Sequence, residues 1–373
     1  MIQKKLNLNC AIGKTGYGIT SLNILKKLFN LDLEVSLFPI GGNQVELNSE
    51  TEKEILQQVF KNAQTFDYSA PCLKIWHQFD LASRIGSGHY YSFPFFEVDK
   101  LKPVEKVHLN SCDGIFVASK WGKQILQDND ITKPIYVSPL AVDLEIFKLP
   151  IKIKVDNAYR FFHIGKWEHR KGHDFLIQAF NAAFTEEDDV ELWLLPHNMF
   201  LKPEEEKFWI EMAKNSKLGN KIKIFDRLPT QYHLAEYIFH GDCGIYLSRA
   251  EGWNNSILES MALSKPIIAT NYSAHTEYCT SKNSYLVDIT ETEIANDGKW
   301  FHGEGSWAKL GQEQLDQTVD LMRFVYNSNI RTNPEGLKTS KEFTWDNTAS
   351  IIHQTLMRNN SYYANSRKKT KRR

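Results

Sequence analysis

Residues 244–270 constrain the fold of this chain more than any other stretch. The apolar run 244–247 has the composition of a buried parallel strand, residues 257–263 have helical spacing, and residues 266–270 read as a second strand. A strand, a helix and a parallel strand form a βαβ unit. Ligands of such sheets bind outside the carboxyl ends of the strands, where the loops turn into helices. The loop between residues 247 and 257 is therefore the first candidate for a binding site.

This loop and the helix after it carry two carboxylates, Glu251 and Glu259. Between them, small polar residues leave backbone N–H groups free at the positive end of a helix. These are Gly252, Asn254, Asn255 and Ser256. Backbone amides can bind anions, and carboxylates can accept hydrogen bonds from hydroxyl groups. Together they suit a ligand such as a nucleotide sugar. The alternative for Glu259 is structural, because Ser256-x-x-Glu259 also has the pattern of a helix-capping box.

A second polar loop, residues 165–172, follows the strand-like run 159–164 and precedes a helical pattern. It contains three cations within six residues, Lys166, Arg170 and Lys171. Charge-assisted hydrogen bonds to phosphate are strong, so this turn is a candidate diphosphate site. Lys166 and Lys171 are the expected phosphate ligands. Arg170 is expected to be a supporting or solvent-facing residue, and a solvated charged turn is the alternative for the whole cluster.

Strand-like and helical patterns alternate through both halves of the chain, which predicts an α/β protein with a doubly wound parallel sheet in each half. Strands are expected near residues 6–11, 34–38, 73–77, 114–118 and 134–137, and then near 159–164, 191–195, 221–225, 244–247, 266–270 and 285–287. The boundary falls where strand patterning stops, between residues 143 and 157.

Composition excludes several classes of protein. Lys plus Arg and Asp plus Glu each total 45, so no nucleic-acid partner is expected. No apolar run approaches the ~20 residues that span a bilayer, and no signal peptide precedes the first strand, so the protein is expected in the cytoplasm. The five cysteines show no Cys-x-x-Cys pairing and are expected to be reduced and buried. The basic tail 367–373 is expected to be disordered, with weak contact to an anionic membrane surface as the alternative.

The Glu251-x7-Glu259 spacing, with its flanking sequence, resembles the signature of the retaining family 4 glycosyltransferases. That resemblance implies the GT-B fold, two Rossmann-like doubly wound parallel-sheet domains facing each other across a cleft. Residues 139–147 resemble the family's exit from the first domain, and residues 343–349 resemble the start of its last helix. The expected division is therefore an acceptor-side domain 1–150, a donor domain 151–340, a helix 341–362 that crosses back, and a tail 363–373.

The resemblance also implies roles for single residues. Glu251 would contact the transferred sugar, Glu259 the ribose, and Lys166 and Lys171 the leaving diphosphate. His77, at the end of a predicted strand, would orient the sugar or act electrostatically. The implied donor-binding set also contains Gly16, Gly18, Arg170, Arg227, Leu228, Gly252, Trp253, Asn254, Asn255, Ser256 and Ile257.

The activity implied is transfer of a sugar, with retention, from a UDP- or GDP-type donor to a hydroxyl of a glycan, lipid-linked or protein acceptor. No cofactor or metal is expected, because Asp128-Asn-Asp130 follows a helical run and reads as a turn. The alternatives are another sugar-nucleotide enzyme of the same fold, such as an epimerase or phosphorylase, and a catalytically silent nucleotide-sugar binder. The Gly- and aromatic-rich segment 297–307 is expected to be a loop with no assigned role.

Overall fold

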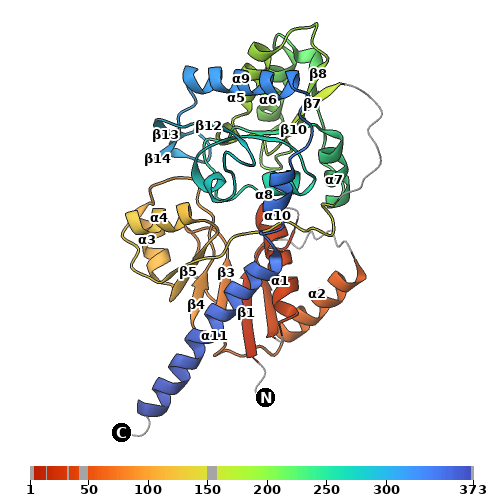
Figure 1. Cartoon of the computed structure of the whole chain (residues 1–373). Helices are drawn as coiled ribbons and strands as arrows, with labels where there is room; N and C mark the ends of the chain where they lie inside the picture. Colours follow the sequence, from red (N-terminus) through yellow and green to blue (C-terminus); the bar gives the residue numbers. More distant parts are fainter. Residues whose placement is uncertain (1–3, 14, 32, 42–48, 149–157, 371–373) are drawn as a thin grey trace. The chain divides into compact units, whose positions relative to one another are not determined.

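The computed structural model describes residues 4–13, 15–31, 33–41, 49–148 and 158–370, with only the helical backbone for residues 359–370. The chain divides into two units (Figure 1). Unit 1 comprises Met1–Phe96, Leu101–Ala141 and Phe343–Arg373, and unit 2 comprises Glu97–Lys100 and Val142–Glu342. The expected boundary at residues 150 and 151 lies outside the described residues.

Unit 1 contains a six-stranded parallel sheet in the order β2-β1-β3-β4-β5-β6. Its strands are β1 (Lys4–Cys10), β2 (Leu33–Pro39), β3 (Cys72–Ile75), β4 (Tyr90–Ser92), β5 (Gly114–Val117) and β6 (Ile135–Val137). Its helices are α1 (Gly16–Phe29), α2 (Glu50–Ala63), α3 (Pro103–Asn110), α4 (Lys120–Asp128) and α11 (Trp345–Thr370). Thr15 and Ser119 accept N–H bonds at the starts of α1 and α4, as good N-cap residues do.

Unit 2 contains a second six-stranded parallel sheet in the order β12-β11-β10-β7-β8-β9. Its strands are β7 (Tyr159–Ile164), β8 (Val190–Leu195), β9 (Ile222–Ile224), β10 (Cys243–Tyr246), β11 (Ile267–Thr270) and β12 (Tyr285–Val287). Its helices are α5 (His173–Ala183), α6 (Pro203–Lys214), α7 (Gln231–His240), α8 (Asn255–Ala262), α9 (Gln312–Asn327) and α10 (Pro334–Ser340), with 3-10 turns η1 (His169–Lys171), η2 (Gly219–Lys221) and η3 (Ser273–Glu277). Every residue of β10 and β11 is buried, as in parallel strands covered by helices on both faces.

The prediction of a parallel α/β sheet in each half is confirmed. The sequence pattern did not predict β4. It also missed an antiparallel pair, β13 (Thr292–Asn296) and β14 (His302–Ala308), where a loop was expected. This hairpin is fixed by burial of Trp307, which is 1% exposed and packs with Val98 and Ala250.

The last helix packs on α1 within unit 1. Trp345, Ala349, Ile352 and Leu356 form its buried stripe at helical spacing. The helix continues to Thr370, past the expected end at residue 362. The expectation of disorder from residue 363 therefore differs from the structure as far as residue 370. The physical reason is that residues 363–370 contain no Gly or Pro that would end the helix.

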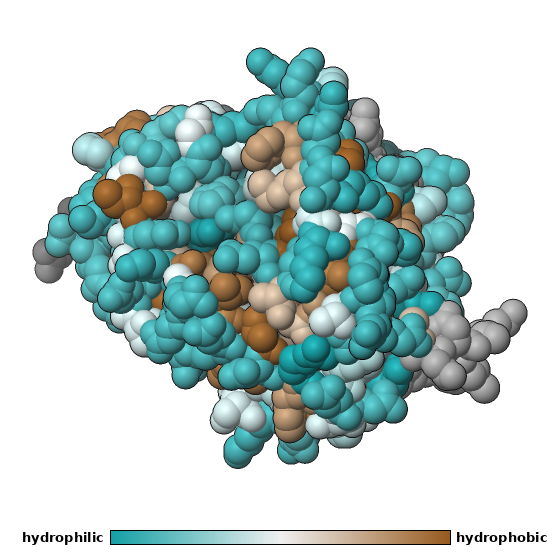
Figure 2. All heavy atoms as spheres, turned by 90° about the horizontal axis from the view of Figure 1, so that it is seen from above, coloured by the Kyte–Doolittle hydropathy of each residue, from teal (hydrophilic) through white to brown (hydrophobic). Residues whose placement is uncertain are grey.

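No helix among the described residues has both the length and the apolar composition needed to cross a bilayer. The face drawn in Figure 2 is mainly hydrophilic, with apolar residues in patches among polar ones.

Gly172 joins the loop after β7 to the helix α5 and has a φ of 75°, in the left-handed region that glycine adopts without strain. A Cβ at this position would lie 2.1 Å from the carbonyl oxygen of Leu247. Glycine is therefore required both by the backbone conformation and by the close approach of the chain that follows β10.

We expect Gly172→Ala to destabilise unit 2 by about 1–2 kcal/mol of backbone strain and about 1–3 kcal/mol of overpacking. Gly298→Ala is the matched control, because Gly298 has a φ of 71° but nothing within 4 Å of its Cβ position. Urea unfolding of both variants measures the difference. Equal losses would show that the contact with Leu247 imposes no constraint.

Candidate active site

Three loops of unit 2 follow three strands that lie side by side in the sheet. Residues 165–172 follow β7, residues 247–254 follow β10, and residues 271–275 follow β11. All three strands are parallel, so the loops meet at the same carboxyl edge. The two polar loops singled out in the sequence are therefore neighbours in space.

Arg170 lies at the centre of this edge and is only 2% exposed. Its Nη2 donates to Glu168 Oε2 at 2.7 Å and pairs with Glu97 Oε1 at 2.9 Å. Its Nη1 donates to Glu251 Oε2 at 3.0 Å and to the carbonyl of Ala250 at 2.7 Å. Arg170 is therefore a supporting residue, and the expectation of a solvent-facing side chain is wrong, because three carboxylates hold the guanidinium inside.

Glu251 is 3% exposed and has three side-chain partners. Lys171 donates to its Oε1 at 2.6 Å, Ser248 donates to the same oxygen at 2.7 Å, and Arg170 donates to Oε2. Burial by itself would raise the pKa of Glu251, but Lys171 and Arg170 outweigh it and hold that pKa well below its usual value. Glu251 is therefore a fixed anion, placed as a hydrogen-bond acceptor.

Two cations of this cluster reach solvent. The Lys166 side chain is 43% exposed and its Nζ lies 3.5 Å from Glu168 Oε1, while the Lys171 side chain is 14% exposed. Both Nη atoms of Arg170, by contrast, are engaged by Ala250, Glu251 and Glu168 inside the cluster. The structure thus separates the three cations into two phosphate candidates and one internal clamp.

Arg249 joins the first two loops and was not singled out in the sequence. Its backbone N–H donates to the carbonyl of Arg170 at 2.7 Å, and its Nη1 donates to the carbonyl of His169 at 2.6 Å. Its guanidinium also binds both oxygens of Asp174 at 3.0 Å and Glu293 at 3.0 Å. This bidentate pair fixes the loop 165–172 against the chain that carries Glu251.

The start of α8 is shaped by Asn254, which has a φ of 85° and makes no side-chain cap. Its Nδ2 lies 3.1 Å from Nε2 of the buried His275. Because the helix begins at Asn255, both Ser256 and Glu259 lie inside it. The capping-box alternative for Glu259 is therefore wrong.

Glu259 is 8% exposed and has no hydrogen bond or ion pair among the described residues. Burial raises its pKa to about 8. A buried carboxyl without a protein partner is costly to ionise, so it is an acceptor that a ligand hydroxyl would satisfy.

The raised pKa of Glu259 makes stability depend on pH. The neutral carboxyl contributes its full stability below the ordinary glutamate pKa of 4.5, and this contribution is lost as the pH rises toward 8. Glu259→Gln mimics the neutral form. One pKa unit corresponds to about 1.4 kcal/mol, so we expect the variant to exceed the native chain by more than about 1 kcal/mol at high pH.

Urea unfolding at pH 4.5 and pH 8 tests this, with exposed Glu187→Gln as the matched control. A stability difference for Glu259→Gln that is the same at both pH values would contradict the raised pKa.

Other residues of the expected donor set are placed differently. Trp253 is 4% exposed and Ile257 is fully buried, so only their backbones can face a ligand. Gly252 is also buried. Arg227 and Leu228 lie in the loop after β9, with Arg227 exposed and Leu228 half-buried. Among the described residues, the side chains of this loop make no hydrogen bond or ion pair with Arg170 or its carboxylate partners.

In unit 1, Gly18 is required by packing within its own turn. Its N–H donates to Thr15 Oγ1 at 3.2 Å, and a Cβ would lie 2.4 Å from the carbonyl oxygen of Gly13. Gly16 is exposed with open space around it. His77 follows β3 and is half-buried among aromatic rings, 4.6 Å from the Tyr17 ring and 5.0 Å from the Phe79 ring between centroids.

The segment 128–130 ends a helix. Asp128 is the last residue of α4, Asn129 is its C-cap, and Asp130 has a φ of 61°. Asn129 donates to the carbonyl of Ile125 at 2.8 Å and accepts the N–H of Leu101 at 2.9 Å. The interpretation as a turn agrees with this geometry.

Sequence reasoning also missed four residues that hold the site together. They are Glu97, Glu168, Ser248 and His275. Glu168 and Ser248 lie next to the two motifs and could have been found from that proximity. Glu97 is far from Arg170 in sequence, and His275 contacts Asn254 from 21 residues away, so no local signal marks these two contacts.

Comparison with known proteins identifies the fold. Two solved structures cover nearly the whole chain. Sucrose-phosphate synthase from Thermosynechococcus elongatus superimposes with a TM-score of 0.71 at 14% identity, over 96% of this chain and 100% of the other. HepE of Anabaena in complex with UDP-glucose gives 0.65 at 15% identity, over 96% and 99%. The two Rossmann-like parallel sheets therefore have the GT-B fold.

Residues 158–297 match the family model described as Glycosyl transferases group 1. The matched region contains the loops after β7, β10 and β11. An uncharacterized glycosyltransferase of Methanocaldococcus jannaschii is 22% identical over 199 residues. That match covers 50% of this chain and 47% of the relative, so it spans about half the length of each.

Proposed function

We propose that this chain is a retaining glycosyltransferase of family 4, which moves a sugar from a UDP- or GDP-type donor to a hydroxyl of a glycan, lipid-linked or protein acceptor. The observation that carries the proposal is the arrangement of Lys166, Lys171 and Glu251 at one sheet edge. Two cations that reach solvent lie beside a fixed carboxylate, which suits a diphosphate joined to a sugar. HepE binds UDP-glucose in its solved structure, so UDP-glucose is the first donor to test.

The Arg170 cluster explains how Lys171 can serve a phosphate. In the structure Lys171 is neutralised by Glu251 at 2.6 Å. A bound diphosphate would compete for its ammonium group, and Glu251 would still be paired with Arg170 at 3.0 Å. The carboxylate is therefore never left as an unpaired buried charge, which would be strongly destabilising.

Contacts between the lysines and the leaving diphosphate would raise the rate of sugar transfer. Negative charge grows on the diphosphate as its bond to the sugar breaks, so a cation held there is worth more in the transition state than in the ground state. Glu251 would accept hydroxyls of the sugar through its remaining lone pairs. Glu259, which has no described partner, would accept the ribose hydroxyls.

Retention is proposed to proceed without an enzyme nucleophile. Both oxygens of Glu251 accept hydrogen bonds from cationic side chains, and the low pKa makes this carboxylate a weak nucleophile and a weak base. The departing diphosphate would itself take the acceptor proton, on the face that the acceptor attacks. His77 is proposed to orient the sugar.

A donor screen tests the proposed function. UDP-, GDP- and ADP-glucose are added to the full chain, and a donor present at about 100 times its dissociation constant is expected to stabilise it by about 2.7 kcal/mol. Transfer to octyl glycosides is then followed by NMR with the best donor, and the product is expected to keep the donor's anomeric configuration.

EDTA should leave the rate of transfer unchanged, because lysines carry the phosphate charge in place of a metal.

An inverted product would contradict retention, and loss of activity in EDTA with recovery on Mg²⁺ or Mn²⁺ would contradict metal independence. Binding without transfer or hydrolysis would indicate a nucleotide-sugar binding protein. If no sugar nucleotide stabilises the chain, the donor site is wrong.

Lys171→Ala probes the diphosphate contact directly. Loss of one charge-assisted bond of ~2–3 kcal/mol corresponds to a fall of roughly 30- to 150-fold in kcat/KM. Because its partner Glu251 is buried, the variant should also lose about 1–3 kcal/mol of stability. Lys309→Ala is the control, since Lys309 pairs with Glu291 at 2.6 Å on the surface. This variant should leave kcat/KM unchanged and should lower the free energy of unfolding by no more than about 1 kcal/mol.

Steady-state kinetics and urea unfolding are measured on both variants. A folded Lys171→Ala protein with unchanged kcat/KM would show that the diphosphate binds elsewhere.

A further inference from the structure

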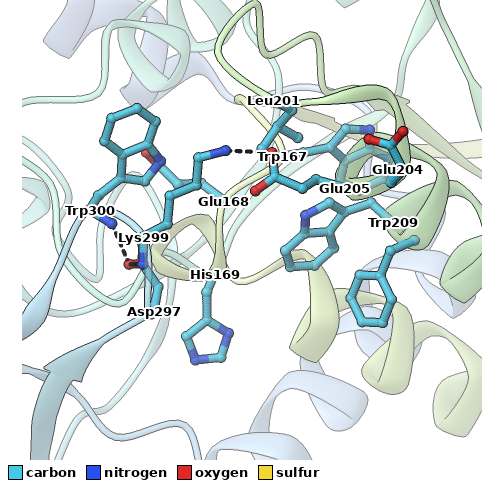
Figure 3. A pocket seen from close by; sticks show the side chains of 11 residues that line it. Trp167, Glu168, His169, Leu201, Glu204, Glu205, Trp209, Asp297, Lys299 and Trp300 are labelled. Carbon is cyan, nitrogen blue, oxygen red and sulfur yellow. Dashed lines mark hydrogen bonds and ion pairs between the residues drawn. The ribbon is translucent and has the colours of Figure 1, made fainter.

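A pocket of about 420 Å³ lies in unit 2 beside the loop 165–172, within the size range of small-ligand sites (Figure 3). Three segments form it: the loop residues 167–169, the start of α6, and the turn between β13 and β14. Its lining residues do not include Lys166, Lys171, Glu251 or Glu259, so it is distinct from the proposed donor contacts.

Aromatic side chains from all three segments make the walls. Trp167 stacks on Trp209 with ring centroids 5.6 Å apart and an interplanar angle of 6°. Phe208 and Trp300 also line the pocket and are 59% and 45% exposed. Figure 3 draws Trp300 and Trp209 on different sides of the pocket. Exposed aromatic side chains that surround a pocket are typical of a site where a ligand covers them.

The turn that carries Trp300 is held in place. The Asp297 carboxylate accepts the N–H groups of Lys299, Trp300 and Phe301 at 2.8–2.9 Å. Lys299 Nζ binds Glu205 at 2.5 Å, which ties this turn to α6. The pocket is thus preorganised before any ligand enters.

The polar groups of the lining disfavour an anion, and they disfavour a cation on the face of Trp300. Four carboxylates line the pocket, from Glu168, Glu204, Glu205 and Asp297, so an anion is disfavoured. A cation is disfavoured on Trp300, because Lys299 Nζ already lies 5.5 Å from its ring centroid.

The lining best suits a neutral ligand that has apolar faces and hydroxyl donors. The carboxylate of Glu204 has no hydrogen bond or ion pair among the described residues, and a carboxylate is an acceptor for hydroxyl groups. We propose that this pocket binds a saccharide, with C–H faces on Trp300 and Phe208 and a hydroxyl donated to Glu204. Resting on the proposed function, that saccharide is a part of the acceptor glycan away from the hydroxyl that reacts.

Binding is tested on the full chain without any nucleotide. Maltotriose, cellotriose, mannotriose and chitotriose are titrated while tryptophan fluorescence and saturation-transfer NMR are recorded. We expect at least one trisaccharide to bind the native chain, and Trp300→Ala to weaken it about tenfold or more, as removal of an anchoring aromatic residue does.

Two pairs of variants separate the site from general effects. Phe324→Ala removes an aromatic side chain of similar exposure, 52%, that does not line the pocket, and should bind as the native chain does. Glu204→Gln should weaken the same trisaccharide, whereas Glu206→Gln, on the same turn of α6 but not in the lining, should leave it unchanged. Melting temperatures verify that all four variants fold.

Three outcomes would overturn the proposal: no trisaccharide binds, Trp300→Ala binds as tightly as the native chain, or choline binds at the pocket in place of the sugars. Its failure is distinguishable from failure of the proposed function. Saccharide binding requires no donor, and UDP-glucose binding to Trp300→Ala should be unchanged. With a confirmed transfer reaction, Trp300→Ala should raise the acceptor KM and leave the donor KM unaltered.

Discussion

The burial of Arg170 among carboxylates is the interaction on which the site depends. A guanidinium that is 2% exposed would be very costly alone, and Glu97, Glu168 and Glu251 compensate it. Because its two Nη atoms point at different partners, one side chain fixes two loops and the segment 97–100. The position of Glu251 follows from this clamp, since its Oε2 is bound to Arg170 Nη1.

The contacts of Arg170 leave two further cations, Lys166 and Lys171, near the surface. Lys166 and Lys171 each pair with one carboxylate of the cluster, yet each reaches solvent. Arg170 stays paired with Glu168 and Glu251 when an anionic ligand draws on these lysines, so neither carboxylate is left without a cation. Glu259 differs, because burial without a partner raises its pKa to about 8. The site therefore combines one carboxylate that is satisfied internally with one that has no hydrogen bond or ion pair among the described residues.

The backbone supplies the rest of the geometry. Parallel pairing of β7, β10 and β11 brings three loops to one edge of the sheet. Gly172 lets the start of α5 approach the carbonyl of Leu247, and Arg249 fastens the same two loops through Asp174. On the side of loop 165–172 that carries Trp167 and Glu168, the β13–β14 turn and α6 form the aromatic pocket. The loop 165–172 thus contributes both to the contacts around Arg170 and to the aromatic pocket.

The sequence by itself determined the two parallel sheets, because strand and helix periods are local properties of side chains. It also determined which loops would meet, since loops after parallel strands share one edge. Only the tertiary structure decided that Arg170 is internal, that Glu259 has no partner among the described residues, and that Glu259 does not cap its helix. It also decided that Glu97 and His275 belong to the site and that residues 292–308 form a hairpin against Val98. The physical reason is that burial and ion pairing depend on contacts between residues far apart in the chain, and such contacts leave no periodic trace in either segment.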